Sequence, residues 1–481
     1  MRVECIEMKD RLTKTAYLKY LACPNEFWLS LKPNTSKKEP ETLEYEHLRQ
    51  QGYEVERYVK QLARFQPNED FSVDFQRVFQ TADLYARSDA VITDKTSGFI
   101  DIYEIKSSST VKPEHLDDVA FQKIVAERSG FTVGRCNIIT MNGEYVRKGS
   151  IDAEQLFLIN DVTDQVAELI PVTELQIESA KAFAVSEPVP SLSDYCGEKL
   201  NCEYIKLNFP DLPEYTVFNI SRINKAKLND LLEHGIIDIR DVPDDFKLSD
   251  KQQVHVTAAK TGLPIIDREK IAEKIASWQY PHHFLDYETF NYAIPQFDGV
   301  RPFQQMCFQY SLHTIREKGS EIEHRQYLAP QTEANPPLAL ASKLQEHMSG
   351  ELGTVFVWYE PFEKTRNDEM AAMFPEFAPF FAELNAHTQD LMKIFSDNLY
   401  VHPAFKGSSS IKKVLPELSP NLSYKNLGIG DGMTASIKWF RAATWDTIGE
   451  DERRQIFADL LEYCNLDTLA MVEIFKELTR L

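Results

Sequence analysis

No stretch of about 18 consecutive apolar residues occurs in the 481-residue sequence, which excludes an ordinary transmembrane helix. The segment Met1–Lys14 is charged and lacks the apolar run of a signal peptide, so we expect a cytoplasmic protein. Internal repeats and low-complexity tracts are absent. Apolar (43%) and charged (26%) contents are those of an ordinary globular chain. At this length the chain should divide into two or three domains.

Positive charge is scarce. The chain has 53 Lys and Arg against 74 Asp and Glu, which gives a net charge of −21. Affinity for phosphate backbones comes mainly from Lys and Arg, so this balance disfavours a long nucleic-acid track. It does not exclude a nuclease, because bound metal ions or a local basic groove can supply positive charge. The charge therefore favours a small or end-directed site.

Periodicity and turn signals predict an α/β chain. The expected elements are largely helical structure over 1–75, two strands over 84–110, a helix near 114–129, a strand near 134–141, a boundary loop at 186–191, short helices over 221–262, strands at 283–290 and 303–313, and a helix over 451–478. A new domain therefore begins near Pro281, after a helical connector of roughly 70 residues.

The segment Phe284–Phe290 (Phe-Leu-Asp-Tyr-Glu-Thr-Phe) reads as a strand in which Asp286 and Glu288 point to the same side. Two carboxylates on one face of an apolar strand repel each other, and Mg²⁺ or Mn²⁺ would remove that cost. An exposed edge strand with two solvated acids is the alternative. In the last helix Tyr463 and Asp467 lie four apart and share a face. The acid could complete a metal site, and the tyrosine could orient an attacking water.

Together these motifs resemble the DnaQ-like (RNase H-like) 3′–5′ exonucleases of the tyrosine subtype. The resemblance covers about residues 281–481 and implies a mixed sheet flanked by helices. That family has a further acid at a helix start, for which Glu363 is the candidate and Asp390 the alternative. The implied reaction is two-metal phosphodiester hydrolysis. The stretch Lys406–Lys413 either contacts phosphates through hydroxyl and ammonium groups or is a solvated loop.

A second constellation lies in the first half of the chain. The strand Ile100–Ser107 carries Glu104 and Lys106 on one face, and Asp89 on the adjoining strand can meet them. An acid pair to hold metal, with a lysine to polarise water or steady the phosphorus, suits phosphodiester cleavage. An Asp followed by Glu-x-Lys is also common by chance.

The flanking text resembles the RecB-family branch of the restriction-endonuclease-like PD-(D/E)XK nucleases, over about residues 8–205. Leu12–Pro24 is similar to that family's opening helix and Cys-Pro. Gly52-Tyr-Glu-Val-Glu56 matches its Gly-x-x-x-His/Glu element, so the resemblance makes Glu56 a further metal ligand. Asp118-Val-Ala-Phe-Gln122 matches its glutamine motif and adds Gln122 to the catalytic set, although Ala126 stands where the family has tyrosine.

Cysteine is scarce as well. In a cytoplasmic chain we expect free or metal-binding thiols rather than disulfides. The seven cysteines are Cys5, Cys23, Cys136, Cys196, Cys202, Cys307 and Cys464. Several RecB-family members hold an iron–sulfur cluster on one early and three late cysteines. Cys23, Cys196 and Cys202 match three of those four positions, and Asn208 stands at the fourth. A lost or altered cluster and a retained metal both remain open.

The complete order also resembles a bacterial family of uncharacterised activity with this fusion. We therefore expect a RecB-like domain at 1–205, a helical connector at 206–280 and a DnaQ-like domain at 281–481. The expected function is a two-site nuclease that acts on DNA in preference to RNA, in DNA repair or in antiviral defence. Two alternatives stay open: one active exonuclease beside a degenerate RecB-like domain that binds nucleic acid or a partner, and a non-catalytic adaptor.

Overall fold

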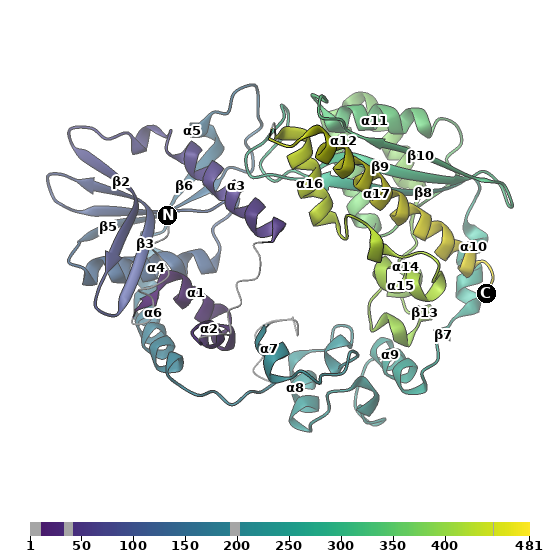
Figure 1. Cartoon of the computed structure of the whole chain (residues 1–481), viewed down its shortest axis with the longest axis horizontal. Helices are drawn as coiled ribbons and strands as arrows, with labels where there is room; N and C mark the ends of the chain where they lie inside the picture. The colour runs from purple at the N-terminus through teal and green to yellow at the C-terminus, as the bar shows by residue number, and fades with distance from the viewer. Residues whose placement is uncertain (1–10, 33–41, 193–202, 446) are drawn as a thin grey trace. The chain divides into compact units, whose positions relative to one another are not determined.

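The computed structural model describes residues 11–32, 42–192 and 203–481 except 446 (Figure 1). The chain divides into two compact units. The N-terminal unit is Met1–Pro210 with Tyr292–Gln304, and the C-terminal unit is Asp211–Asn291 with Gln305–Leu481. Each combines helices with a sheet, so the α/β class is confirmed. Within the described ranges, no helix combines the length and apolarity that a membrane crossing requires.

The N-terminal unit is built on a six-stranded mixed sheet in the order β1-β3-β4-β5-β6, with β2 also paired to β3. Its elements are β1 (Leu12–Thr13), α1 (Lys14–Ala22), α2 (Pro24–Ser30), α3 (Leu43–Val59), β2 (Phe71–Gln80), β3 (Leu84–Asp94), β4 (Ile100–Ile105), α4 (Pro113–Arg128), β5 (Val133–Met141), α5 (Ala153–Leu156), β6 (Phe157–Asp161), α6 (Thr163–Ala184) and α7 (Glu203–Asn208). The predicted strand pair, helix and following strand between residues 84 and 141 are confirmed. Strand β2 lies partly in a segment predicted to be largely helical.

Local signals explain the parts of this unit that carry candidate residues. The turn between β3 and β4 forms because Asp94 accepts from the amides of Thr96 and Ser97, both at 2.8 Å, and Gly98 has a positive φ of 74°. Helix α1 begins where the Thr13 hydroxyl accepts from Ala16 N at 3.1 Å. Helix α4 packs its apolar face, including Val119 and Phe121, into the core of the sheet.

The C-terminal unit contains a five-stranded sheet in the order β10-β9-β8-β11-β12 and a two-stranded sheet, β13-β7. Its elements are α8 (Lys225–Glu233), α9 (Asp250–Thr261), β7 (Ile265–Ile266), α10 (Arg268–Ser277), β8 (His282–Phe290), β9 (Met306–Ile315), β10 (Ile322–Leu328), α11 (Pro336–His347), β11 (Thr354–Val357), α12 (Glu360–Met373), α13 (Ala378–His387), β12 (Thr388–Asp390), α14 (Lys393–Ser396), β13 (Tyr400–Val401), α15 (Ile411–Leu418), α16 (Gly432–Thr444) and α17 (Glu450–Leu478). The predicted strands at 283–290 and 303–313 and the long last helix are confirmed. Most of the predicted connector packs within this unit.

Strand β8 is buried on both faces because its side chains alternate between two apolar layers. On one face Phe284 packs with Phe475 of α17, which crosses β8 and β9 (Figure 1). On the other face Leu285 packs with α11 and α13. Asp286 and Glu288 have the parity of Phe284, so they share the face covered by α17.

The segment between β8 and β9 belongs to the N-terminal unit, although the sequence assigned it to the last domain. Ala293 N donates to Gln51 Oε1 at 3.2 Å, and Arg147 pairs with Gly299 and Val300 through two backbone hydrogen bonds of 2.9 and 3.1 Å. The apolar residues that follow β8 are buried in the N-terminal unit and not against the five-stranded sheet to which β8 belongs, which is why the units divide differently from the predicted domains.

The pairing of β8 with β11 yields a stability prediction at Gly353, which has a φ of +51°. A Cβ there would overlap the backbone of Tyr280 and Pro281, just before β8, whereas Gly350 (φ +113°) has open space at the same point. Alanine strains the backbone at both positions, because both have a positive φ. The difference between the two losses of unfolding free energy therefore measures the steric overlap at Gly353. We expect Gly353→Ala to cost about 1–3 kcal/mol more unfolding free energy than Gly350→Ala in urea titrations. Equal losses would contradict the described strand pairing.

Candidate metal centre

Four predicted carboxyl groups in the C-terminal unit act on one another electrostatically. Asp286 and Glu288 come from β8, Glu363 from the first turn of α12 and Asp467 from α17. Glu288, Glu363 and Asp467 are 7%, 3% and 9% exposed, so little water is available to solvate their charges. The sequence placed these acids on one strand and two helices, and packing of the helices on the strand brings them together.

Burial is the main electrostatic feature of this group. It raises the pKa of Asp286 and of Glu288 well above their usual values, and the neighbouring charge of Asp467 adds to both shifts. Burial also raises the pKa of Asp467 to about 6, although hydrogen bonds and Lys412 oppose the shift. The raised pKa values mean that the surroundings do not neutralise these carboxylates when they are ionised, which a divalent cation would do.

The structure distinguishes the two candidates for the third acid. Glu363 Oε2 is buried without a hydrogen-bond partner, and burial followed by the charge of Asp286 raises the pKa of Glu363. Asp390 instead accepts backbone hydrogen bonds from Tyr359 and Glu360, both at 3.2 Å, and from Met392 at 3.0 Å. Both Asp390 oxygens thus accept hydrogen bonds from backbone amides where α12 begins. Because Glu363 keeps an oxygen without such a partner, the geometry favours Glu363 as the metal ligand.

Three further side chains complete the group. The Tyr424 hydroxyl donates to Asp467 Oδ1 at 2.6 Å, and Lys412 Nζ donates to the Tyr463 hydroxyl at 3.2 Å. The Lys412 ammonium lies over the rings of both tyrosines, at 5.4 and 5.3 Å from their centroids. Of the predicted Lys406–Lys413 stretch, Lys412 reaches the site. Lys406 is paired with Glu214 elsewhere in the unit.

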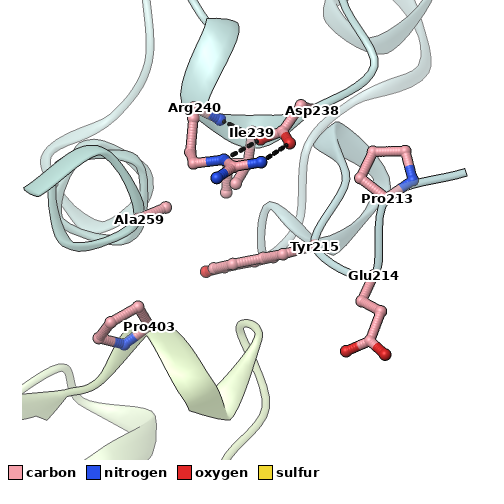
Figure 2. Close-up of a pocket in the computed structure, with 8 residues that line it drawn as sticks. All are labelled: Pro213, Glu214, Tyr215, Asp238, Ile239, Arg240, Ala259 and Pro403. Atoms are coloured by element: carbon pink, nitrogen blue, oxygen red, sulfur yellow. Dashed lines mark hydrogen bonds and ion pairs between the residues drawn. The ribbon is translucent and has the colours of Figure 1, made fainter. Parts of the chain in front are cut away.

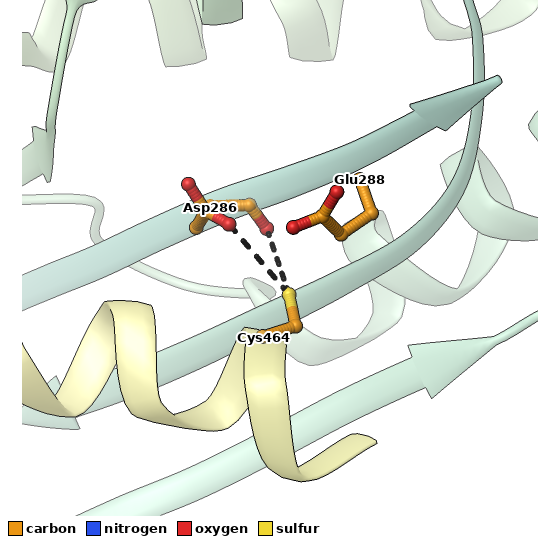
Figure 3. A group of neighbouring side chains, drawn as sticks. All are labelled: Asp286, Glu288 and Cys464. Carbon is orange, nitrogen blue, oxygen red and sulfur yellow. Dashed lines mark hydrogen bonds between the residues drawn. The ribbon is translucent and has the colours of Figure 1, made fainter. Parts of the chain in front are cut away.

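Cys464 of α17 faces Asp286 and Glu288 of β8 (Figure 3). Its Sγ lies 3.7 Å from Asp286 Oδ2 and 3.9 Å from the Asp286 backbone oxygen. Asp286, Glu288 and Cys464 each offer one atom that could bind a metal ion, and these three atoms lie within 4.8 Å of one another. Sequence reasoning missed Cys464 and Tyr424. For Cys464 a signal existed, since it lies three residues before Asp467 and shares its helical face.

The predicted residues of the N-terminal unit also meet. Glu104 and Lys106 lie at the end of β4, with Asp89 on β3 accepting from Ile105 N at 2.9 Å. Gln122 of α4 donates to Glu104 Oε2 at 2.6 Å and to Asp118 Oδ1 at 2.8 Å. Asp118 was not among the predicted site residues, although it precedes Gln122 by four and therefore shares its helical face.

Every carboxylate oxygen of Glu104 and Asp118 has a partner from the chain itself. Lys106 Nζ lies 2.7 Å from Glu104 and 2.6 Å from Asp118. Lys14 Nζ, at the start of α1, lies 3.1 and 3.2 Å from the two Glu104 oxygens and 3.2 Å from Asp118 Oδ1. Gln122 supplies the remaining contacts. Sequence reasoning had no signal for Lys14, which is 90 positions from Glu104.

These lysines change the electrostatics of the N-terminal group. Burial, with Asp89 and Asp118 nearby, raises the pKa of Glu104 to about 8. Burial would also raise the pKa of Asp118, but Lys14 and Lys106 outweigh it and lower that pKa to about 2. Three carboxyls thus face two ammonium groups that the chain provides. The C-terminal group has no comparable internal neutralisation among the described residues, because Lys412 is shared with two tyrosines and Arg366 is paired with Glu369.

Glu56, the remaining predicted N-terminal ligand, joins the group through an amide. Gln76 Nε2 lies 3.4 Å from both Glu56 Oε2 and Asp89 Oδ1. Gln76 has a φ of +57° where the pairing of β2 with β3 is interrupted, which turns its side chain toward these acids. Lys60 is paired with the other Glu56 oxygen at 2.8 Å. Glu56 is therefore close to Asp89 and already neutralised.

The cysteine prediction is corrected at Cys23, which is disulfide-bonded. Cys136, Cys307 and Cys464 are free, as expected. Cys196 and Cys202, the other two residues of the predicted cluster, lie outside the described residues. Cys23 lies at the junction of α1 and α2, where its sulfur accepts from Glu26 N at 3.5 Å.

A pocket of about 280 Å³ in the C-terminal unit lies between α9 and residues near Tyr215 and Pro403 (Figure 2). Its single guanidinium, Arg240, is held by Asp238 through hydrogen bonds of 2.9 and 2.5 Å. None of the predicted site residues lines it. We assign it no chemistry.

Comparison with known proteins gives two matches. Residues 283–410 match a family described as "Domain of unknown function (DUF2779)". The chain is also similar to "Uncharacterized protein UU173" of Ureaplasma parvum serovar 3, at 28% identity over 211 residues. That match covers 40% of this chain and only 30% of the relative's length. The family segment includes Asp286, Glu288 and Glu363 and ends before Asp467.

The pKa of Asp467 predicts how the metal-free protein responds to pH. Its folded value of about 6, against 3.8 ordinarily, means that the folded state holds a proton that the unfolded state has lost. Unfolding free energy should therefore fall as pH rises from about 4 to about 7, by about 3 kcal/mol. Asp467→Asn should reduce this fall and leave the protein at least as stable at neutral pH.

The measurement is urea unfolding across this pH range in the presence of a chelator. Glu462→Gln, on the exposed side of the same helix, is the control and should keep the wild-type profile. An unchanged profile in Asp467→Asn would show that its carboxylate is not destabilised by its neighbours.

The role of Lys14 leads to a separate prediction. Lys14→Met leaves Glu104 and Asp118 short of a cation, so the chelated protein should lose about 1–3 kcal/mol of unfolding free energy. Mn²⁺ should restore more stability to this variant than to the wild type, since an ion can take the place of the ammonium group. Lys181→Met, which breaks a surface pair with Asp83, is the control and should cost under about 1 kcal/mol. If Lys14→Met and Lys181→Met lose the same small amount of stability in thermal unfolding, Lys14 does not neutralise Glu104 and Asp118.

Proposed function

We propose that the chain is a metal-dependent nuclease whose C-terminal unit hydrolyses phosphodiester bonds from a 3′ end. The observation that carries the proposal is the excess of buried, unneutralised carboxylate around Asp286, together with the unpartnered oxygen of Glu363. Dry carboxylates of this kind fit divalent cations that prefer oxygen ligands, such as Mg²⁺ or Mn²⁺.

The topology of the C-terminal unit supports an RNase H-like fold. Numbered along the chain, its five strands follow the order 3-2-1-4-5, with antiparallel β8, β9 and β10 and parallel β8, β11 and β12. The first strand carries the Asp-x-Glu motif, and the last helix carries Tyr-x-x-x-Asp against it. This order agrees with the DnaQ-like resemblance of the sequence.

The chain's own residues suit hydrolysis at a phosphate. Metal ions bound by Asp286, Glu288, Glu363 and Asp467 would activate water and stabilise the leaving oxygen. The Tyr463 hydroxyl can orient the attacking water, since it lies on the face of α17 that carries Asp467. Lys412, which donates to that hydroxyl, carries the positive charge that attracts a scissile phosphate.

We also propose a second nuclease site in the N-terminal unit. The order α3-β2-β3-β4-α4-β5, with β4 parallel to β5, supports the restriction-endonuclease-like assignment. Asp89 and Glu104 would hold metal with help from Glu56, and Lys106 would face the phosphate. Metal binding there requires the ammonium group of Lys14 to move, because it contacts both Glu104 oxygens.

That requirement favours one alternative function. A site whose acids are already neutralised by Lys14, Lys106 and Gln122 can be stable without a cation and without catalysis. In that case the N-terminal unit binds nucleic acid or a partner, and the C-terminal unit alone is an exonuclease. DNA ends remain the preferred substrate in both versions, because the acidic chain disfavours a long binding track.

A digestion panel of end-labelled single- and double-stranded DNA and RNA tests the proposal. With Mn²⁺ present, Asp286→Asn should lower one activity about 100-fold or more, and Lys106→Ala should lower a different one by a similar factor. The two losses should be separable, and Glu462→Gln should retain both activities.

Each other result has a distinct meaning. Full activity in Lys106→Ala would establish the single-exonuclease alternative. Loss of every activity in each variant would mean that the two sites are obligately coupled. A wild-type protein that cleaves nothing in the panel, with either metal, would leave the adaptor alternative.

A further inference from the structure

We propose that Cys464 is a thiol ligand of the C-terminal metal centre and gives it a preference for thiophilic divalent ions, such as Co²⁺, Zn²⁺ or Cd²⁺, over Mg²⁺. The proposal rests on the metal centre of the proposed function and goes beyond it by naming the class of ion that the site selects. Nothing in the sequence resemblance assigns a role to this residue.

The geometry supports a shared ion. The Cys464 sulfur and one oxygen each of Asp286 and Glu288 lie within 4.8 Å of one another (Figure 3). Zinc-like ions bind sulfur at about 2.3 Å and carboxylate oxygen at about 2.0–2.2 Å in tetrahedral geometry, so two ligands of one ion lie about 3.6 Å apart. Side-chain movement of about 1 Å would bring these three atoms to such distances.

The surroundings of Cys464 differ from those of the other described free thiols. Cys136 belongs to the apolar core of the N-terminal unit, and Cys307 belongs to the apolar layer under α11. Both fill space as small apolar side chains. Cys464 is just as buried, but its sulfur contacts the Asp286 carboxylate. A thiol in contact with carboxylates is poorly explained by packing alone.

The proton balance explains both the metal-free and the metal-bound state. Without a cation the Cys464 thiol donates to Asp286 Oδ2 at 3.7 Å. When a thiophilic ion binds, the S–H bond is broken and a sulfur–metal bond forms, and the thiol proton leaves to solvent together with any proton that the Asp286 and Glu288 carboxyl groups hold. The thiolate and two carboxylates then supply three negative charges to a divalent ion. Mg²⁺ gains little from sulfur, whereas Zn²⁺, Co²⁺ and Cd²⁺ accept it readily.

Cobalt gives a direct test, because a thiolate bound to Co²⁺ produces a near-ultraviolet charge-transfer band that carboxylates do not. Chelator-treated full-length protein should develop this band as Co²⁺ is added. Cys464→Ser should lose the band, and Cys136→Ser, a matched buried thiol in the other unit, should keep it. Cd²⁺ affinity, measured by calorimetry, should fall at least tenfold in Cys464→Ser, while Mn²⁺ affinity should change less than twofold.

The outcomes separate this proposal from the proposed function. A band that survives in Cys464→Ser, or no band in a wild type that binds Mn²⁺ through Asp286, overturns the thiol ligand and leaves the nuclease proposal intact. No Mn²⁺ or Co²⁺ binding that depends on Asp286 overturns both. Should Cys464→Ser fail to fold, Cys464→Ala with the same two measurements gives the same decision.

Discussion

Burial of like charges is the constraint around which the C-terminal unit is arranged. Carboxylates from one strand and two helices lie in a space with little water, and their mutual repulsion opposes the packing of α12 and α17 on β8. The apolar contacts of Phe284 with Phe356 and Phe475 hold these elements together despite that repulsion. Binding of a cation at these carboxylates would relieve the repulsion, which makes the group a candidate functional site.

The N-terminal unit uses similar residue types with a different balance. Its acids lie between Lys14 and Lys106 and are bridged by Gln122, so the chain satisfies them without an external ion. The two units therefore differ less in which residues they contain than in what neutralises them. This difference makes the C-terminal centre the stronger candidate for metal binding and leaves the N-terminal group with two proposed roles.

Sequence reasoning succeeded where one local period decides the geometry. The two-residue period of a strand put Asp286 and Glu288 on one face, and the helical period did the same for Tyr463 and Asp467. It failed where partners come from distant segments, as with Lys14 beside Glu104 and Tyr424 beside Asp467. Those pairings depend on how helices and strands pack against one another, which cannot be read from the sequence pattern of one segment.

Sequence patterns also gave no signal for the placement of the segment 292–304. Strand β8 runs from Asp286 and Glu288 into this segment, which belongs to the other unit. The apolar residues of that segment predict that it is buried, but they do not indicate in which of the two hydrophobic cores.

The most direct measurement is the position of Mn²⁺ in crystals soaked with that ion, located by its anomalous scattering. We expect a peak within coordination distance of Asp286 and Glu288, with Glu363 or Asp467 among the other ligands. No peak at these residues at saturating Mn²⁺, or a peak confined to Asp89 and Glu104, would contradict the central claim.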